Sequence, residues 1–220
     1  MNYYAIILAG GIGKRMKNDI PKQFITLKGI PLLMYSIKQF YSAIPSISII
    51  VVLPKAKMEA WKTLCNEHAF NIPHKIADGG PERFHSVKNA LLYVKADGIV
   101  AIHDGARALV STELIKKTFE LTAKYDNAVP AISIKDSLRI VDAALNKQID
   151  RKIIKSIQTP QCFMSSAILK AYRQVYSKEF TDDASVYEKD GNSINLIEGD
   201  TKNIKITYPE DLIIAEALIS

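Results

Sequence analysis

The sequence predicts an α/β protein with a mostly parallel sheet and helices on both faces. Apolar, β-branched segments of strand length alternate along the chain with longer amphipathic segments. A glycine-rich loop directly follows the first strand segment. With 220 residues, of which 48% are hydrophobic, the chain is long enough for one sizeable domain and short for two full ones. We therefore expect residues 1–220 to form a single domain.

The elements follow from the apolar spacing in each segment. The expected strands are 4–8, 47–53, 74–76, 98–102, 127–132 and 194–198. The expected helices are 32–43, 55–69, 82–95, 111–124 and 166–176. A last helix, 209–219, opens with Pro-Glu-Asp, which suits the first turn of a helix.

One segment, about 137–159, departs from this alternation. Two short β-like pieces, 138–141 and 152–157, are joined by the polar, turn-prone segment 142–150. An isolated two-stranded hairpin is only marginally stable in water, so it must pack on something else. The segment predicts a protruding β-hairpin arm that embraces a second subunit; the alternative is a mobile surface flap.

The loop after the first strand carries the clearest chemical signal. Gly10, Gly11 and Gly13 follow the strand, and the cations Arg15 and Lys22 come next. Glycines let the backbone approach a ligand and turn its N–H groups toward an anion, and the two cations can clamp phosphate oxygens. The spacing matches neither the P-loop nor the G-x-G-x-x-G dinucleotide pattern. It indicates a polyphosphate site of another kind, with a tight turn beside two surface cations as the alternative.

The composition of the chain limits the classes of partner that we expect. The net charge of +6 favours anionic ligands, but the 29 basic residues are spread along the chain, so we expect a small phosphorylated substrate and no nucleic acid. No apolar run approaches the roughly 20 residues of a membrane span, and the N-terminus lacks signal-peptide features, so no membrane is expected. Cys65 and Cys162 lie far apart and outside any Cys/His cluster, so a reducing cytoplasm is the default location.

Four further motifs follow expected strands or open expected helices. They are Asp-Gly-Gly-Pro-Glu-Arg-Phe-His-Ser-Val at 78–87, His-Asp-Gly-Ala-Arg at 103–107, Thr-Asp-Asp-Ala-Ser at 181–185 and Asn-Ile-Lys-Ile-Thr at 203–207. Ligands of open α/β sheets bind outside the carboxyl ends of the strands. The glycine loop and the first two of these motifs are therefore expected to share one crevice.

In this order the motifs resemble those of the 2-C-methyl-D-erythritol 4-phosphate cytidylyltransferase family, within the sugar-nucleotidyltransferase superfamily. The resemblance runs from Leu8 to Leu212. It implies a Rossmann-like fold, a homodimer formed through the arm, CTP as co-substrate and a divalent cation, usually Mg²⁺. The implied reaction transfers CMP from CTP to 2-C-methyl-D-erythritol 4-phosphate and releases pyrophosphate. Alternatives are a ribitol 5-phosphate cytidylyltransferase, a uridylyl- or guanylyltransferase, and a non-catalytic nucleotide-binding protein.

The resemblance also implies residue roles. The nucleotide would be bound by Ala9, Gly10, Gly11, Gly13, Arg15, Lys22, Gly80, Ser86 and Lys205. The catalytic cations would be Arg15, Lys22, Arg151 and Lys205. The polyol phosphate would be met by Asp104, Arg107, Ser137, Arg151, Thr159 and Thr181, with Arg151 and Thr159 reaching into the partner's site. Asp104 is also the candidate metal ligand, although the metal would be held mainly by the CTP phosphates.

These roles agree with the chemistry. The attacking group is already a phosphate oxygen anion, so catalysis needs positioning and charge stabilisation rather than a strong base. His103 is accordingly expected to be packed and hydrogen-bonded. The sequence departs from the family pattern at Pro81, at Gly105 and Ala108 around Arg107, and at Ser137, where threonine is common. None of these departures removes a charged group.

Overall fold

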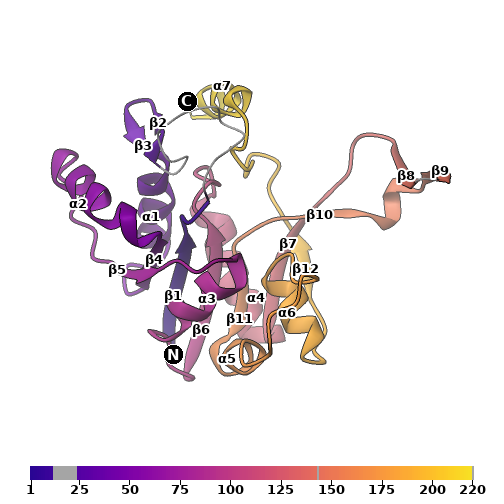
Figure 1. Ribbon diagram of the computed structural model, residues 1–220, viewed down its shortest axis with the longest axis horizontal. Coiled ribbons are helices and arrows are strands. Elements are labelled where there is room, and N and C mark those ends of the chain that lie inside the picture. The colour runs from indigo at the N-terminus through magenta and orange to yellow at the C-terminus, as the bar shows by residue number, and fades with distance from the viewer. Residues whose placement is uncertain (12–23, 143, 220) are drawn as a thin grey trace.

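The computed structural model describes residues 1–11, 24–142 and 144–219. Its centre is an eight-stranded sheet in the order β10-β7-β11-β6-β1-β4-β5, with β12 beside β7 (Figure 1). The parallel part contains β1 (Asn2–Leu8), β4 (Ser48–Leu53), β5 (Lys75–Asp78) and β6 (Gly98–Asp104). The carboxyl ends of these strands therefore meet at one edge of the sheet.

The other half of the sheet is mixed. β7 (Asn127–Ser133) pairs in parallel with β12 (Leu196–Glu198) and antiparallel with β10 (Lys155–Ile157). β11 (Gln161–Met164) lies between β6 and β7 and is antiparallel to both. The sheet is thus mostly parallel with antiparallel insertions, which confirms the expected fold class.

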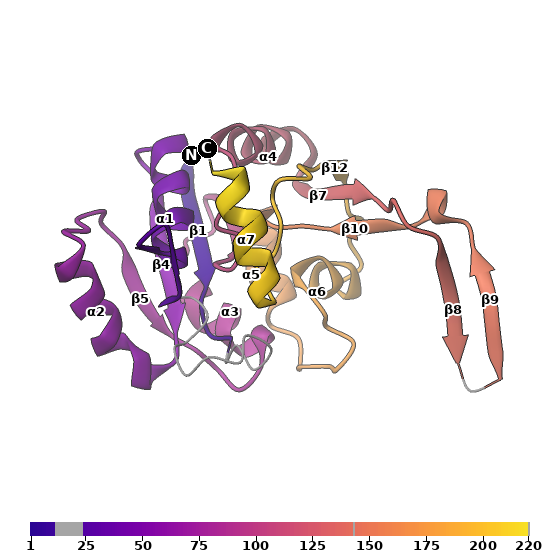
Figure 2. The same cartoon turned by 90° about the horizontal axis from the view of Figure 1, so that it is seen from above.

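Alternate residues of β1 face opposite layers of helices. Ala5 and Ile7 pack with apolar residues of α1 (Leu32–Ala43) and α4 (Thr112–Tyr125). Tyr4 and Ile6 pack in the cluster that includes residues of α3 (Arg83–Leu91), α5 (Ser165–Ala171) and α6 (Asp183–Lys189). Figure 2 shows α4 on one side of the sheet and α3 and α6 on the other. The two-residue period of the strand therefore produces a sheet that is buried on both faces.

Smaller elements complete the body. A 3₁₀ turn, η3 (Lys55–Lys57), leads into α2 (Met58–Glu67), whose Trp61 is buried. The short hairpin of β2 (Thr26–Leu27) and β3 (Ile30–Pro31) contributes Leu27 to a third apolar cluster. The last helix, α7 (Pro209–Leu218), contributes Ala215 to the same cluster. Within the described residues, no helix is both long enough and apolar enough to cross a membrane.

The arm is present, but its second strand was wrongly placed by the sequence prediction. β8 (Leu138–Asp142) pairs with β9 (Leu145–Ile149), whereas 155–157 returns to the main sheet as β10. The hydropathy pattern does not show β9, because neither face of this strand is buried and its residues therefore do not alternate between apolar and polar. The hairpin projects from the body in both ribbon views (Figures 1 and 2).

Other boundaries also shift. The helices expected at 82–95 and 166–176 end at Leu91 and Ala171, and the helix expected at 55–69 is divided between η3 and α2. β11 was not expected, because its four residues follow a turn-like Gln-Thr-Pro segment. The helix expected from the 181–185 motif is confirmed as α6, which opens with a capping box between Asp182 and Ser185.

Candidate active site

Asp104 lies at the carboxyl end of β6 and is surrounded by cations. The Lys205 Nζ atom is 2.8 Å from Asp104 Oδ2, Arg83 Nε is 3.9 Å from Oδ1, and Arg107 Nε is 4.0 Å from Oδ2. Burial alone would raise the pKa of Asp104, but Arg83, Lys205 and Arg107 outweigh it and hold that pKa well below its usual range. Asp104 is therefore an anion at neutral pH, set among side chains that suit a phosphorylated ligand.

The Arg83 guanidinium is fixed by a buried carboxylate. Its Nη1 and Nη2 atoms donate to the two oxygens of Asp183 at 2.7 and 2.5 Å, and the Tyr172 hydroxyl donates to Asp183 at 2.6 Å. Asp183 is fully buried. This ion pair joins α3 to α6 and holds Arg83 in reach of Asp104.

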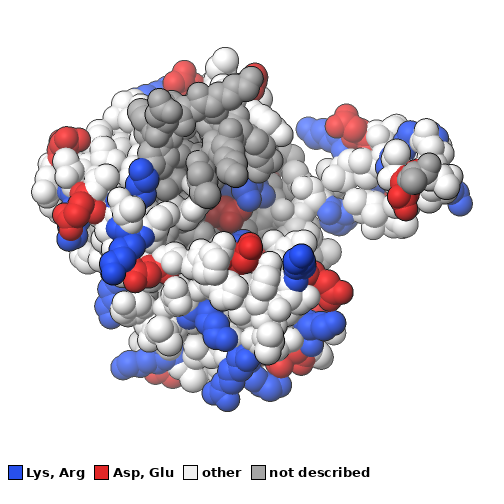
Figure 3. Space-filling view, viewed as in Figure 1, with Lys and Arg blue, Asp and Glu red and all other residues white. Residues whose placement is uncertain are grey.

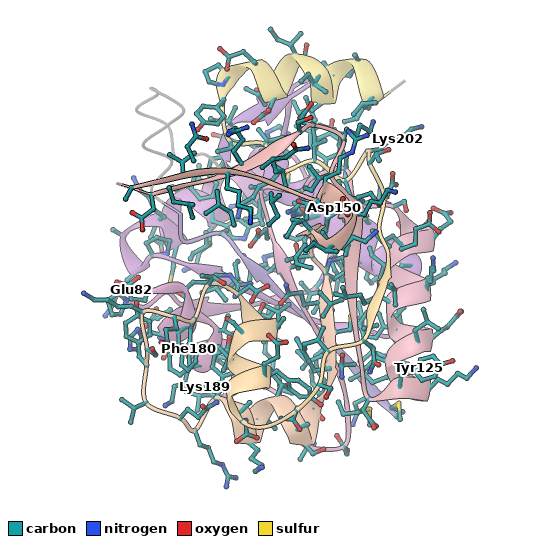
Figure 4. The ribbon with its side chains drawn as sticks, turned by 90° about the vertical axis from the view of Figure 1, so that its right-hand side faces the viewer. Glu82, Tyr125, Asp150, Phe180, Lys189 and Lys202 are labelled. Atoms are coloured by element: carbon teal, nitrogen blue, oxygen red, sulfur yellow. The ribbon has the colours of Figure 1, made fainter. Side chains whose placement is uncertain are left out.

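Aromatic packing reinforces the contact between α3 and the segment before α6. The rings of Phe84 and Phe180 stack with centroids 5.4 Å apart. Figure 4 labels Phe180 near Glu82, the residue that precedes α3. The turn before α3 and the start of α6 are thus parts of one packed unit.

The residues expected to recognise the base come together from three elements. Gly80 N donates to Ser86 Oγ at 3.0 Å, and a Cβ placed on Gly10 would lie 3.9 Å from the same oxygen. Gly80 has no room for a side chain, because an added Cβ would be 2.3 Å from the Cβ of His85. Ala9, at the start of the glycine loop, is buried, and its N–H donates to the Val52 carbonyl. The turn after β5, the start of α3 and the end of β1 therefore meet.

Three of the predicted residues, Gly13, Arg15 and Lys22, lie outside the described residues. Their expected contacts with the triphosphate stay predictions. Gly11, which is described, has no atom within 4 Å of an added Cβ among the described residues. Among the described residues, none would block a ligand that approaches the Gly11 backbone.

The residues expected to meet the polyol phosphate lie in three places. Asp104, Arg107 and Thr159 lie together: Thr159 Oγ1 accepts a hydrogen bond from Asp104 N at 3.0 Å. Arg107 Nη1 donates to the carbonyl oxygen of Asn203 at 2.7 Å, and burial lowers the pKa of Arg107. Thr181 lies just before α6, where its N–H donates to Ser185 Oγ at 3.1 Å.

Ser137 and Arg151 belong to the base of the arm. Both are exposed, and the Arg151 guanidinium donates to the carbonyl oxygen of Lys135. Arg151 opens the 3₁₀ turn η4 (Arg151–Ile153), which Asp150 caps by accepting from Lys152 N at 2.9 Å (Figure 4). The contact predicted for Arg151 and Thr159 in the partner's site depends on a second subunit and stays a prediction.

Sequence reasoning missed several residues that support the site, chiefly Arg83, Asp183 and Tyr172. It also missed Gln161, whose amide bonds both Asp182 and the backbone of Ala184. The available signal was polarity in an apolar setting. Gln158 and Thr159 follow β10, Gln161 opens β11, and all three side chains are buried. Buried polar side chains are hydrogen-bonded as a rule, and these bonds hold the active-site segments together.

The described residues do not fit a metal ion held by the protein itself. Among the described residues, no group of three or more His, Cys, Asp and Glu side chains is placed to hold a metal ion. Asp104, the candidate ligand, already faces three cationic side chains that would repel a further cation. Charged side chains of both signs lie side by side in a hollow of the face shown in Figure 3.

Comparisons with known proteins agree with this arrangement. A family model described as 2-C-methyl-D-erythritol 4-phosphate cytidylyltransferase matches residues 3–220. The protein of that name from Phocaeicola vulgatus is 45% identical over 219 residues, and the match covers 100% of both chains. The one from Azobacteroides pseudotrichonymphae is 46% identical over 217 residues and covers 98% of both chains. The crystal structure of the Francisella tularensis protein of that name is 31% identical, with a TM-score of 0.82 and coverage of 100% of both chains. The resemblance read from the motifs is confirmed: the chain belongs to the 2-C-methyl-D-erythritol 4-phosphate cytidylyltransferase family.

Proposed function

We propose that this chain transfers CMP from CTP to 2-C-methyl-D-erythritol 4-phosphate, forming 4-diphosphocytidyl-2-C-methyl-D-erythritol. A phosphate oxygen of the polyol attacks the α-phosphorus of CTP, and the bond from that phosphorus to the β-phosphate oxygen breaks to release pyrophosphate. The observation that carries the proposal is the cluster of Lys205, Arg107 and Arg83 around Asp104, at the sheet edge where the glycine loop begins. Both substrates are anionic, and fixed cations offset their mutual repulsion.

The geometry supports a division of work between charge and positioning. Lys205 is half exposed and supplies a cation that stabilises charge on the α-phosphate as pyrophosphate departs. Asp104 orients this ammonium, and its carboxylate oxygens accept hydrogen bonds from substrate hydroxyls. Arg107, anchored on the Asn203 carbonyl, holds the polyol phosphate. No proton needs to be removed from the nucleophile, so a strong base is not required.

On the nucleotide side, we assign the cytosine to the Gly80 and Ser86 backbone and to the Ser86 hydroxyl. We assign the triphosphate to the loop that begins at Ala9, with Arg15 and Lys22 as its cations. The divalent cation is expected to arrive on the CTP phosphates, because the described residues offer no ligand set of their own. Cys65 and Cys162 are free thiols, the usual state in the reducing cytoplasm, where we place the reaction.

The active unit proposed is a homodimer formed through the arm. β8 and β9 pair only with each other among the described strands, and their exposed apolar side chains include Ile140, Val141 and Leu145. A bare hairpin with exposed apolar residues is marginal in water, and a second copy of the chain would cover it. Arg151 at the arm's base would then reach the partner's site.

The test is pyrophosphate release from CTP and Mg²⁺, with 2-C-methyl-D-erythritol 4-phosphate and ribitol 5-phosphate assayed in parallel. UTP and GTP replace CTP in control reactions. We expect turnover with CTP and the methylerythritol phosphate only. Preference for ribitol 5-phosphate would reassign the acceptor, preference for another nucleotide would reassign the donor, and no turnover with any pair would overturn the proposal.

A further inference from the structure

His103 is a buried ionisable residue to which the proposed reaction gives no chemical step. It is the penultimate residue of β6, it is completely buried, and it directly precedes Asp104. Its ring packs edge-on against Phe40, with ring centroids 5.2 Å apart. Because the ring is fully buried, any contribution to the reaction must pass through neighbouring residues.

The hydrogen bonds of His103 define its tautomer. Nε2 lies 3.2 Å from the carbonyl oxygen of Arg107, which can only accept, so Nε2 carries the proton. Nδ1 lies 3.1 Å from Thr159 Oγ1, and that hydroxyl already accepts from Asp104 N at 3.0 Å. The hydroxyl proton of Thr159 is therefore free to be donated to an unprotonated Nδ1. Burial lowers the pKa of His103 to about 4, which agrees with a neutral ring at pH 7.

These bonds hold both ends of one turn. Arg107 N donates to the Asp104 carbonyl at 2.9 Å, which closes a turn over residues 104–107. Thr159 fixes the entry of the turn through Asp104 N, and His103 fixes its exit through the Arg107 carbonyl. Thr159 is itself anchored, because the Asn203 side-chain amide donates to its carbonyl at 2.8 Å.

We propose that the buried pair of His103 and Thr159 acts as a positioning device that sets the direction of the Asp104 and Arg107 side chains toward the polyol phosphate. The order of donors runs from Asp104 N to Thr159 Oγ1 to His103 Nδ1, and from His103 Nε2 to the Arg107 carbonyl. Thr159, which the family resemblance implies to contact substrate, also acts through this chain of hydrogen bonds. The inference rests on the proposed function for its kinetic readout.

The first test uses the unmodified protein. Long-range ¹⁵N–¹H correlation spectra at pH 7 report which ring nitrogen of each histidine is protonated. We expect the His103 signals to show a neutral ring with protonated Nε2 and bare Nδ1. A ring protonated at Nδ1, alone or together with Nε2, would overturn the proposal without any variant having to fold.

The second test is kinetic and uses matched variants. Thr159→Val removes the hydroxyl but keeps the shape, and we expect kcat/KM for the polyol phosphate to fall by about 10²-fold, the cost of misplacing reacting groups. Thr159→Ser restores the hydroxyl and should recover most of the activity. The control is Thr118→Val: Thr118 is a fully buried threonine of α4 that bonds only within its helix among the described contacts. It should leave kcat/KM unchanged.

Two substitutions of His103, which each keep one of its two hydrogen-bonding positions, add a readout that a purely structural role would not give. His103→Asn retains an acceptor near the Nδ1 position, and His103→Gln retains a donor near the Nε2 position. We expect each to lower kcat/KM for the polyol phosphate while the KM for CTP stays within about twofold, and the double variant with Thr159→Val to be no worse than the poorer single variant. If the wild type turns over and Thr159→Val matches it, the inference fails while the proposed function stands.

Discussion

The Lys205 Nζ atom lies 2.8 Å from Asp104 Oδ2, although about half of the chain separates the two residues. Two further bonds tie the same segments: Ile206 N donates to the Ala106 carbonyl at 2.9 Å, and Arg107 Nη1 donates to the Asn203 carbonyl at 2.7 Å. The segment 203–206 is thereby held against the turn after β6. Backbone hydrogen bonds as well as charge therefore hold Lys205 beside Asp104.

Lys205→Ala is expected to lower kcat by about 10²–10³-fold, as for the loss of one donor to a transition-state anion. Lys205→Arg keeps the charge and should retain part of the activity. Lys202→Ala is the matched control, because Lys202 is an exposed lysine of the same segment (Figure 4). Pyrophosphate release under saturating CTP measures all three. Equal activity of the Lys205→Ala and Lys202→Ala proteins would remove Lys205 from the mechanism.

Asp104 predicts a pH-dependent contribution to stability. Its pKa in the folded protein is depressed, so its stabilising effect is complete above the unfolded value of about 3.9 and is lost as pH falls toward the folded value. The free energy of unfolding lost in Asp104→Asn should therefore be constant from pH 7 to 5 and shrink below about pH 4. Urea unfolding at a series of pH values measures it. The control is Asp150→Asn, because Asp150 is an exposed helix cap and Asn is also a good cap. A loss of stability in Asp104→Asn that grew as the pH fell would contradict the stabilisation of Asp104 by its three cations.

The buried pair of Arg83 and Asp183 predicts a large stability effect. Asp183→Asn removes the carboxylate that bonds the Arg83 guanidinium and leaves only Asp104, 3.9 Å away, to offset its charge. It should lower the free energy of unfolding by about 3–5 kcal/mol. Tyr172→Phe removes one donor to the same carboxylate and should cost about 1.5–3 kcal/mol. Urea denaturation at pH 7 provides the values.

The control for this pair is the exposed ion pair of Lys189 with Glu179, whose charged atoms lie 3.5 Å apart. Lys189 is on α6, the helix that carries Asp183 (Figure 4). Glu179→Gln should change the free energy of unfolding by no more than about 1 kcal/mol. Comparable losses in the buried and exposed pairs would show that burial does not set the strength of the Arg83 contact.

The dimer proposal predicts complementation between two inactive variants. If Arg151 serves the partner's site, a heterodimer of Arg151→Ala and Lys205→Ala subunits holds one site with neither substitution. Mixed subunits should then recover turnover that neither variant shows alone. Native mass spectrometry verifies the heterodimer, and Lys147→Ala, an exposed cation of the arm, is the control for Arg151→Ala. Verified heterodimers without activity would place Arg151 in its own subunit's site or in none.

The alternation of strands and helices was predictable because it depends on local periodicity. β1, β4, β6 and α4 were placed to within a few residues, since each buries a clear apolar face. The strand β9 was missed because its residues are mostly polar and mostly exposed, and β11 was missed because it has only four residues after a turn-like segment. The sequence also indicated which motifs lie at strand ends. In the structure Gly10 follows the end of β1, Gly79 follows β5 and Asp104 ends β6.

Local sequence alone determined the fold class, the glycine loop and the family, because these are encoded by neighbouring residues in a fixed order. Only the tertiary structure showed that Arg83 is held by Asp183, 100 positions along the chain. It also showed that the Thr159 hydroxyl is hydrogen-bonded to Asp104 N and to His103 Nδ1. The physical reason is that a buried polar atom must find a partner wherever the fold supplies one. The partner of each buried polar atom depends on how β6, α3 and α6 pack against one another, and a local sequence pattern does not contain this information.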